Sequence, residues 1–418
     1  MCRRAGAENI SLINMTLTFR AYDASHCAYP RNEIPVMPPL EAGAIGRSNS
    51  ARYPSAFSDS AQAVFARGRY ALFHALRTLG VDDRHSVMIP AYHCRTMIDP
   101  VVHAGAGVAL FPLHRDLSPD LDRLSSTLAS AERPVKALLL PHYFGWPQDI
   151  EPVVAFCRRH GIALIEDCCH AYFGSWRGRM LGTWGDCAIA SPSKFFACED
   201  GGAFTTSLLS QPPSLRPRSF VDELRAVFHS AEGALLRRKR RFNAQTPQSL
   251  SNRFENIRGR FPQWSNDIED ARGSLSHHYR PELDATSALV WSRYLVRWSD
   301  VEQLCERRRA NFTALLDGVK ELPNCRPLYS QLPSGIVPYM FPLHIEQPEH
   351  RFHWLKHLGT PMYRWDELAV SDCAVSSHYR LRLVHLPCHQ AMRAEDIAWL
   401  LETLALVLRA QPKAVVAN

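Results

Sequence analysis

The sequence has no long apolar run, and this absence excludes one class of protein. No stretch approaches the roughly 20 consecutive apolar residues that a membrane helix needs. The N-terminus, MCRRAGAENISLINMTLTF, has no continuous apolar segment followed by a small-residue cleavage site. We therefore expect no membrane partner and a cytoplasmic location.

Cysteine is sparse and shows no metal-binding pattern. The 12 cysteines are scattered over 418 residues, many of them inside apolar runs. The pair Cys168-Cys169 has no second cysteine pair at the spacing of a zinc site. We expect reduced, packed thiols and predict no metal site.

The charge balance is also modest, with a formal net charge of +7. Much of the basic excess lies in LLRRKRRF, around Arg237 to Arg241. Nucleic-acid binding needs a fold or an aromatic pattern to accompany such charge, and the sequence shows neither. No nucleic-acid partner is expected, and the run is interpreted as a solvated helical face within a basic insertion over about 210–275.

The sequence does contain an alternation of helix and strand signals between about residues 65 and 207. Apolar residues recur at helical spacing in GRYALFHALRTLG and in DIEPVVAFCRRHG. Short apolar runs lie around them: SVMIP, GVALFPL, VKALLLP and IALIED. Continuous apolar strands between amphipathic helices indicate an α/β fold, with a mostly parallel sheet covered by helices on both faces.

The remainder of the chain has a different character. Residues 210–275 are rich in Pro, Arg and Ser and show no clear strand, and the first 33 residues carry no strong pattern. One long amphipathic helix is expected next, followed by a smaller α+β domain with a strand near GIVPYMFPLHI and a closing helix in AEDIAWLLETLALVLRA. The predicted organisation is an N-terminal arm over 1–50, a large domain over 51–275, and a connecting helix with a small domain over 276–418.

Polar residues stand at the carboxyl ends of the apolar strands. Asp167 ends IALIED, Ser191 and Lys194 follow the strand in DCAIASPSK, and His142 and Tyr143 follow VKALLLP. Ligands of open α/β sheets bind outside the carboxyl ends of the strands. The sequence therefore predicts one site that brings these side chains together.

Lys194 indicates the chemistry of that site. An ammonium in apolar surroundings loses hydration unless it is paired, deprotonated or covalently bound. A desolvated lysine is a nucleophile that forms a Schiff base with a carbonyl. Pyridoxal phosphate (PLP) is a carbonyl cofactor whose ring nitrogen needs a carboxylate, which Asp167 would supply. Taken singly, Lys194 also fits a surface lysine and Asp167 a strand-end cap.

The cofactor's phosphate needs donors as well. A helix opens at Gly68, and the N–H groups and positive dipole end of a helix N-terminus suit an anion. Arg69 would add charge beside Tyr70, and the hydroxyl of Ser191 would add a hydrogen bond.

These residues resemble the DegT/StrS-type aminotransferases of PLP fold type I. The resemblance extends from IPVMPPLEAG to HLPCHQAMRAEDI and is most specific in PHYFGWPQDIEPVVAFCRRHGIALIEDCCHAYFGSWRGRMLGTWGD. It implies a large domain with a mostly parallel sheet of the seven-stranded type and a smaller α+β C-terminal domain. By the resemblance, Lys194 is the Schiff-base lysine, Asp167 pairs with the pyridine nitrogen, and His170 lies near the ring hydroxyl.

The chain also departs from the family pattern. Cys94 stands at the position of the cofactor-stacking aromatic, so Tyr92, His93 or an apolar contact would have to cover the ring. His278 replaces the asparagine of an Asn-Tyr-Arg segment that in the family reaches a neighbouring subunit's phosphate. Arg69 and Tyr70 replace small hydroxyl residues at the helix opening.

The activity implied by the resemblance is ping-pong transamination. An amino acid, most often glutamate, would donate its amino group to a keto or aldehyde group of a sugar or similar small acceptor, as in sugar or polysaccharide biosynthesis. The resemblance also implies a homodimer with shared active sites. Candidates for substrate contact are His142, Tyr143, Arg280 and Arg364. Two alternatives stay open: a PLP enzyme of another type (racemase, decarboxylase or lyase), and a non-catalytic regulatory member of the fold.

Overall fold

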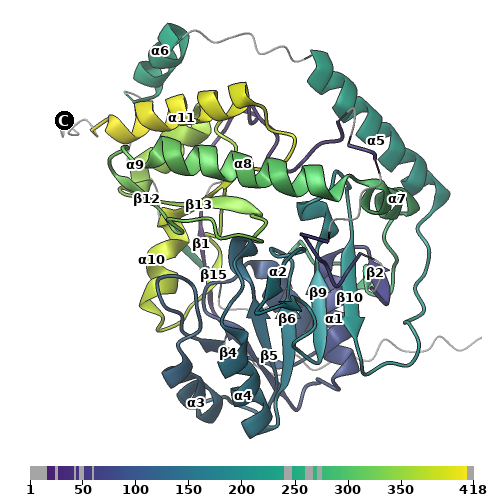
Figure 1. The fold of residues 1–418 in the computed structure, drawn as a ribbon. Coiled ribbons are helices and arrows are strands. Elements are labelled where there is room, and N and C mark those ends of the chain that lie inside the picture. Colours follow the sequence, from purple (N-terminus) through teal and green to yellow (C-terminus); the bar gives the residue numbers. More distant parts are fainter. Residues whose placement is uncertain are drawn as a thin grey trace, which may run out of the picture.

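A seven-stranded sheet forms the centre of the fold (Figure 1). The computed structural model describes residues 17–23, 27–41, 44–46, 51–58, 61–239, 247–258, 267–270 and 275–411. The strand order is β2 (Ala63–Phe65), β10 (Gly202–Thr206), β9 (Cys187–Ala190), β6 (Ala163–Asp167), β5 (Val135–Pro141), β3 (Ser86–Pro90) and β4 (Gly107–Phe111). The strands from β9 to β4 are parallel, and β10 is antiparallel to both of its neighbours. The expected α/β class and mostly parallel sheet are confirmed.

Helices cover both faces of this sheet, which explains why its strands are apolar without alternation. On one face, Val87 and Ile89 pack with α1 (Gly68–Thr78) and α2 (Arg95–His103). On the other face, Met88 and Leu138 pack with α3 (Leu121–Ala129) and α4 (Ile150–His160). Helix α4 ends at Gly161, whose left-handed φ of 64° suits glycine and turns the chain directly into β6.

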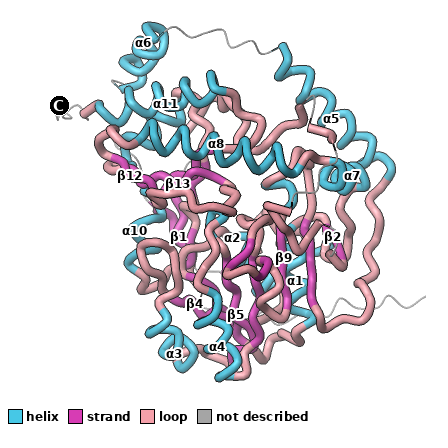
Figure 2. The backbone as a smooth tube through the Cα atoms, in the orientation of Figure 1, coloured by secondary structure: helices cyan, strands magenta, loops and turns pink. Residues whose placement is uncertain are grey.

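A second, antiparallel sheet lies in the C-terminal part of the chain. Its order is β12 (Cys325–Pro327), β13 (Met340–Ile345), β16 (Leu383–Pro387) and β14 (Tyr363–Arg364). A separate apolar core joins it to α8 (Val301–Val319), α9 (Pro348–His357) and α11 (Ala394–Arg409). Figures 1 and 2 show α8 and α11 running side by side above this sheet, while α10 (Ala374–Arg382) lies at its other side. The strand and the closing helix expected for a smaller α+β region are present; the exact domain boundaries stay a prediction.

A small sheet was missed by the sequence analysis. Strand β1 (Phe19–Tyr22) pairs with both β11 (Asp267–Asp270) and β15 (Leu368–Ala369). The expectation of no strand in 210–275 and no pattern in the first 33 residues was therefore wrong. Each strand has four residues or fewer and its partners lie far away in the sequence, so local periodicity could not reveal them.

The expected single long helix is two helices. Helix α7 (Val290–Trp298) ends at Ser299, and α8 begins after Asp300. The Asp300 carboxylate accepts a hydrogen bond from the Gln303 N–H at 3.0 Å, which caps the new helix. The apolar periodicity continues across the break, but the capping aspartate divides it.

The insertion over about 210–275 contains α5 (Phe220–Lys239) and α6 (Pro247–Arg258). Side chains from residue 235 through the basic run lie outside the described residues, so the interpretation of that run as a solvated face stays a prediction. In the part of the chain that the structure describes, no helix combines the length and apolar character needed to span a membrane. The described cysteines are all free, and most of them are buried.

Short connecting elements complete the chain. A two-stranded hairpin follows β6, and single 3-10 turns lie after β5, after β9 and before α7. Their bounds are β7 (Ser175–Trp176), β8 (Arg179–Met180), η1 (Tyr143–Gly145), η2 (Pro192–Lys194) and η3 (Pro281–Leu283). Turn η2 matters most here, because it carries Lys194 away from the end of β9.

Candidate active site

Lys194 lies at the end of η2, just past the carboxyl end of β9, as the sequence analysis expected of its position. Its Nζ lies 5.3 Å from the centre of the Tyr339 ring. The Lys194 charge also acts on His170 and His385, lowering the pKa of each after the larger effect of burial. The amine therefore lies near an aromatic ring and two imidazoles, which come from the loop after β6 and from the C-terminal sheet with the residue that precedes it.

Asp167 is buried at the carboxyl end of β6. Its Oδ1 accepts a hydrogen bond from the Cys169 N–H at 2.8 Å. Burial raises the pKa of the Cys169 thiol, Asp167 raises it further and Lys194 opposes that rise. Cys169 is thus close to both Asp167 and Lys194, which indicates that these two residues belong to one site.

The N-terminus of α1 faces the same place. A Cβ on Gly68 would lie 3.2 Å from the Cys169 Sγ and 3.7 Å from the Ser191 Cβ. Glycine allows the first turn of α1 to approach the two loops closely. The N-cap residue of α1, Arg67, makes no side-chain capping bond, so the helix end keeps its affinity for an anion. Gly68, Asp167, Ser191 and Lys194 are therefore brought together.

His170 is held rigidly beside the amine. Its Nδ1 accepts a hydrogen bond from the Phe144 N–H at 3.4 Å, and its ring lies 4.4 Å from the ring of Tyr339. Burial first, and then the Lys194 charge, keep the pKa of His170 well below its ordinary value. The imidazole is therefore neutral at physiological pH, and with Nδ1 accepting, Nε2 carries the proton.

The structure shows the surroundings of Cys94, which stands where the family has a cofactor-stacking aromatic residue. Cys94 is half-buried at the N-cap of α2, with its Sγ 2.9 Å from the Thr96 Oγ1. His93 is buried and its Nε2 accepts the Ala369 N–H at 3.2 Å, so its ring is committed to the contact with β15. Tyr92 is also buried, and its hydroxyl lies 3.0 Å from the His385 Nε2.

Trp365, which was not predicted from the sequence, completes an aromatic wall made of Tyr92, His170, His385 and Trp365. The Trp365 ring lies 5.0 Å from that of Tyr92, 5.3 Å from His385 and 5.5 Å from His170. Trp365 stands in the segment PMYRWDEL, which drew attention only for Arg364. In the sequence, nothing on either side of Trp365 marks it as a residue of the site.

Arg364 points elsewhere. Its Nη2 lies 3.1 Å from the Asp366 carboxylate, and its guanidinium lies 3.6 Å from the centre of the Phe352 ring and 5.1 Å from that of Tyr22. Trp365, which follows the end of β14, instead contacts Tyr92 and His170. The Arg364 guanidinium is therefore engaged within the chain.

A basic hollow opens beside α1. Arg69 donates a hydrogen bond to the His278 carbonyl, and the Arg280 N–H donates to the Tyr70 hydroxyl at 3.4 Å. A cavity of about 460 Å³ lies here. It is lined by the basic residues Arg67, Arg69, Arg218, His277, His278 and Arg280 and also by the acids Glu199 and Asp200. The resemblance predicts that the segment His278-Tyr279-Arg280 reaches the phosphate of a neighbouring subunit. In this structure the segment contacts the start of α1 in its own chain, which is itself predicted to bind the phosphate.

His142 is occupied within the chain. It is fully buried, its Nδ1 accepts the Gln148 N–H at 3.1 Å, and its Nε2 therefore donates to the Glu166 carboxylate at 3.3 Å. Glu166 in turn accepts N–H bonds from Gly182 at 2.9 Å and Gly185 at 2.8 Å. Although His142, Glu166 and Cys168 are close enough to hold a metal ion, the two polar members are already saturated with protein hydrogen bonds.

Tyr143 is similarly engaged. Its ring is buried and its hydroxyl donates a hydrogen bond to the Tyr92 carbonyl. Neither Tyr143 nor His142 offers a free polar atom to a substrate in this arrangement. Tyr143 instead supports the backbone of Tyr92, and His142 supports Glu166.

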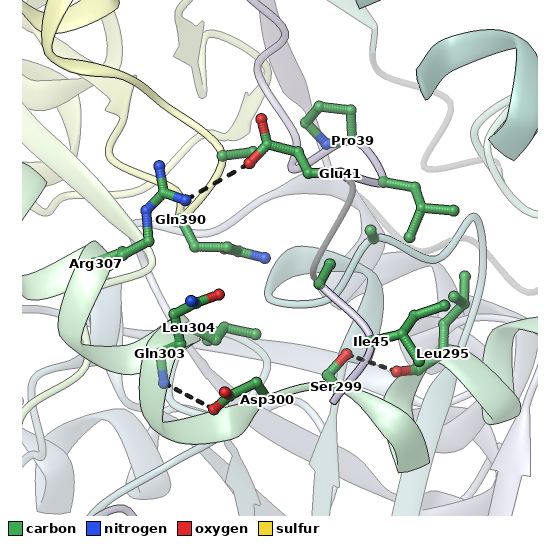
Figure 3. A pocket seen from close by; sticks show the side chains of 14 residues that line it. Pro39, Glu41, Ile45, Leu295, Ser299, Asp300, Gln303, Leu304, Arg307 and Gln390 are labelled. Carbon is green, nitrogen blue, oxygen red and sulfur yellow. Dashed lines mark hydrogen bonds and ion pairs between the residues drawn. The ribbon is translucent and has the colours of Figure 1, made fainter. Parts of the chain in front are cut away.

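A second, smaller cavity is lined by Arg307, Glu41 and Gln390 among other residues (Figure 3). It has a volume of about 40 Å³ and lies between Pro39–Glu41, Ala44 and Ile45 on one side and the end of α7, the start of α8, Ala197 and Gln390 on the other. An ion pair of 3.7 Å joins Arg307 to Glu41 across it. A space of this size holds a few water molecules, at roughly 10–15 Å³ each, and is too small for a cofactor.

Comparison with known proteins agrees with this geometry. Residues 56–208 match the family model of the DegT/DnrJ/EryC1/StrS aminotransferases. This segment contains β6, η2 and α1, which carry Asp167, Lys194 and Gly68. The resemblance stated from the sequence is confirmed.

Curated relatives match over the same part of the chain. The chain is 33% identical over 145 residues to a putative L-glutamine:3-amino-2,3-dideoxy-scyllo-inosose aminotransferase of Micromonospora echinospora, covering 34% of each protein. It is 32% identical over 171 residues to L-glutamine:scyllo-inosose aminotransferase of Streptomyces griseus, covering 38% of this chain and 39% of the relative. The chain therefore matches little more than a third of the length of these relatives.

Solved structures match over a longer span. DesV of S. venezuelae, in complex with a ketimine intermediate, aligns with a TM-score of 0.58 and 18% identity, over 84% of this chain and 85% of DesV. The putative sugar aminotransferase Spr1654 of Streptococcus pneumoniae, in its PLP form, aligns with a TM-score of 0.58 and 14% identity, over 90% and 98% of the two chains. At these identities the likeness establishes the shared fold.

Proposed function

We propose that the protein is a PLP-dependent aminotransferase that transfers an amino group from glutamate or glutamine to a keto group of a sugar or cyclitol. The observation that carries the proposal is the convergence of Lys194, Asp167 and the Gly68 helix start at the carboxyl ends of the parallel strands. The similar proteins named above are aminotransferases, which supports the reaction, and their names suggest the acceptor class.

The residues present fit the cofactor. The close approach of Gly68 to the loop of Cys169 and Ser191 makes a cradle that a side chain on residue 68 would fill. The α1 N-terminus with Arg69 and Ser191 would hold the phosphate, and Tyr70, His278 and Arg280 would line its surroundings. Asp167 would hold the ring nitrogen, His170 would lie near the ring hydroxyl, and Trp365 would cover the ring region that Cys94 cannot.

The chain's own residues then determine the proton chemistry. When bound, PLP supplies an electron sink for the carbon that loses its proton. The Lys194 Nζ is the base within reach, and it would carry the proton away from the donor carbon and return it on the acceptor side. Burial lowers the pKa of His385 to about 3, so neither it nor the neutral His170 places a competing positive charge next to this amine.

The experiment that tests this function is a panel of amino donors and keto acceptors. The purified protein, supplied with PLP, is incubated with glutamate or glutamine and with keto sugars, keto cyclitols and simple ketones. We expect conversion of at least one keto sugar or cyclitol, with release of the matching 2-oxo acid measured by mass spectrometry. Racemised, decarboxylated or eliminated products would favour another PLP reaction, and failure to bind PLP would favour a non-catalytic role.

We also propose a homodimer. Helix α5 exposes an apolar stripe of Phe220, Val221, Leu224, Val227 and Phe228, with Phe220 75% exposed. Exposed Val290 and Tyr294 of the neighbouring α7 extend it. An exposed apolar patch that spans two helices is typical of a protein interface. A second copy of the chain is the occupant expected from the resemblance.

Replacing Phe228 with glutamate is expected to convert the dimer to a monomer, because the charge would have to be buried in the apolar interface. Sedimentation velocity measures the outcome over a range of concentrations. Arg225→Ala, at an exposed polar position of the same helix, is the control and should leave the dimer intact. A wild-type protein that is monomeric, or a dimeric Phe228→Glu variant, would contradict this use of the stripe.

A further inference from the structure

Arg308 is a fully buried arginine on α8. Each of its five N–H donors has an acceptor. Its Nε donates to the Gln390 Oε1 at 2.9 Å. Nη1 donates to the carbonyls of Pro338 and Tyr339 at 3.2 and 3.1 Å. Nη2 donates to the carbonyls of Lys194 and Phe195 at 2.8 and 3.2 Å.

None of these five acceptors carries a charge. Burying a guanidinium is costly unless its hydrogen bonds are complete, and a carboxylate partner is the usual compensation. Here neutral oxygen atoms take that place, and the Phe195 ring lies 4.7 Å from the guanidinium carbon. Only the rigid planar fork of arginine presents five donors in fixed directions, since lysine has three on a flexible stem.

The acceptors belong to two segments that form the candidate site. Lys194 and Phe195 are the root of the lysine-bearing loop. Pro338 and Tyr339 lead into β13, and the Tyr339 ring faces both the Lys194 Nζ and His170. Gln390 closes the arrangement, because its Nε2 donates to the Phe195 carbonyl at 2.8 Å. The Arg308 side chain therefore fixes the backbone of Lys194 and the backbone of Tyr339, whose ring lies beside the Lys194 amine.

We propose that Arg308, supported by Gln390, is a positioning residue that holds the Lys194 amine against Tyr339 in the geometry required for cofactor attachment and proton transfer. The proposal rests on the function proposed above for Lys194. The planar fork of Arg308, and not its charge alone, supplies this effect.

Arg308→Lys tests the proposal, because it keeps the charge and removes the fork. Arg309→Lys is the matched control: Arg309 is adjacent on α8 and donates to the Pro333 carbonyl at 2.9 Å, and no bond to the lysine-bearing loop is found for it in the described part of the chain. Two measurements are made on cofactor-free protein. They are amide hydrogen exchange of residues 193–197, and the rate at which added PLP becomes covalently attached at Lys194, located by borohydride reduction and peptide mapping.

In Arg308→Lys, we expect attachment to slow by about tenfold to a hundredfold, the effect of a misplacement near 1 Å. The Phe195 and Phe196 amides, which bond to the Pro192 carbonyl at 2.9 Å in the wild type, should exchange about tenfold faster. Arg309→Lys should match the wild type in both measurements. Unchanged exchange and attachment in Arg308→Lys would overturn the proposal.

Two further results keep the proposal distinct from the proposed function. If wild-type protein never attaches PLP at Lys194, the proposed function fails, while the exchange measurement still decides whether Arg308 holds the loop. If Arg308→Lys does not fold, Gln390→Leu removes only the amide that bridges Arg308 and Phe195. Gln390 lines the small cavity of Figure 3, so this change is easier to accommodate. It should also accelerate exchange, and its failure to do so would count against the proposal.

Discussion

Replacing Lys194 with alanine is expected to abolish turnover and the visible absorbance that accompanies covalent attachment of PLP. The variant loses the nucleophile and the base together. Loss of the proton-transfer role alone is worth about 10²–10⁴-fold in rate, and loss of covalent attachment adds to it. Steady-state assay with the best acceptor, together with the absorbance spectrum of the PLP-treated protein, measures both effects.

The control for this prediction is Lys320→Ala. Lys320 is exposed and pairs with Asp317 at 2.6 Å, so its loss should leave activity and spectrum unchanged. An active Lys194→Ala protein that still attaches PLP would refute the assignment of the lysine. A folded but inactive variant, with an unchanged melting temperature, would support it.

Replacing Glu166 with glutamine is expected to destabilise the protein by about 1–3 kcal/mol, the cost of leaving buried hydrogen-bond donors without an acceptor. One carboxylate oxygen accepts N–H bonds from Trp184 and Gly185, and the other accepts from Gly182 and His142. Whichever way the glutamine amide is turned, its NH₂ group faces N–H donors. Chemical denaturation at neutral pH measures the loss.

The same carboxylate predicts how stability depends on pH. Burial acts to raise the pKa of Glu166, but the hydrogen bond from His142 and the backbone N–H groups outweigh it, and the pKa is lowered. The stabilisation is therefore complete above the unfolded-state pKa of about 4.3 and is lost as the pH falls toward the lower folded-state pKa. The wild type should lose stability more steeply than Glu166→Gln in this acid range.

Glu151→Gln provides the comparison. Glu151 is an exposed carboxylate that pairs with Arg177, and exposed pairs of this kind contribute about 0–1 kcal/mol. Its variant should follow the wild-type curve at every pH. Equal stability of Glu166→Gln and wild type at neutral pH would show that the hydrogen bonds of Glu166 to His142 and to the backbone of residues 182–185 do not stabilise the fold.

The residues that local sequence could identify are those at strand ends and at a helix start. Asp167 and Lys194 each stand where an apolar strand stops, and parallel strands bring their carboxyl ends to one edge. Gly68 stands where a helix begins, and a helix N-terminus suits an anion. The central sheet followed from the same runs, since strands buried on both faces are continuously apolar. These signals require only the chain on either side of each residue.

Trp365, Tyr339 and Arg308 could not be found in that way. Each reaches the site from the C-terminal sheet or from α8, and each takes its meaning from residues more than a hundred positions away, as the Arg308 bond to Lys194 illustrates. In the sequence, Arg308 is one of three consecutive arginines with nothing to distinguish it. His142 and Arg364 show the converse, because a polar residue beside a site was occupied by partners that only the tertiary structure supplies.

The sheet formed by β1, β11 and β15 has a consequence for the order of folding. Strand β15 begins soon after Trp365, and β1 holds it from the other end of the chain, while the Tyr22 hydroxyl bonds to His353 across 331 positions of sequence. Contacts over such separations form late, because the intervening chain must first be ordered. During synthesis, Lys194 and Asp167 emerge early, but the aromatic wall opposite them is fixed only after the C-terminal strands have been made. The site is thus expected to mature as one of the last events of folding.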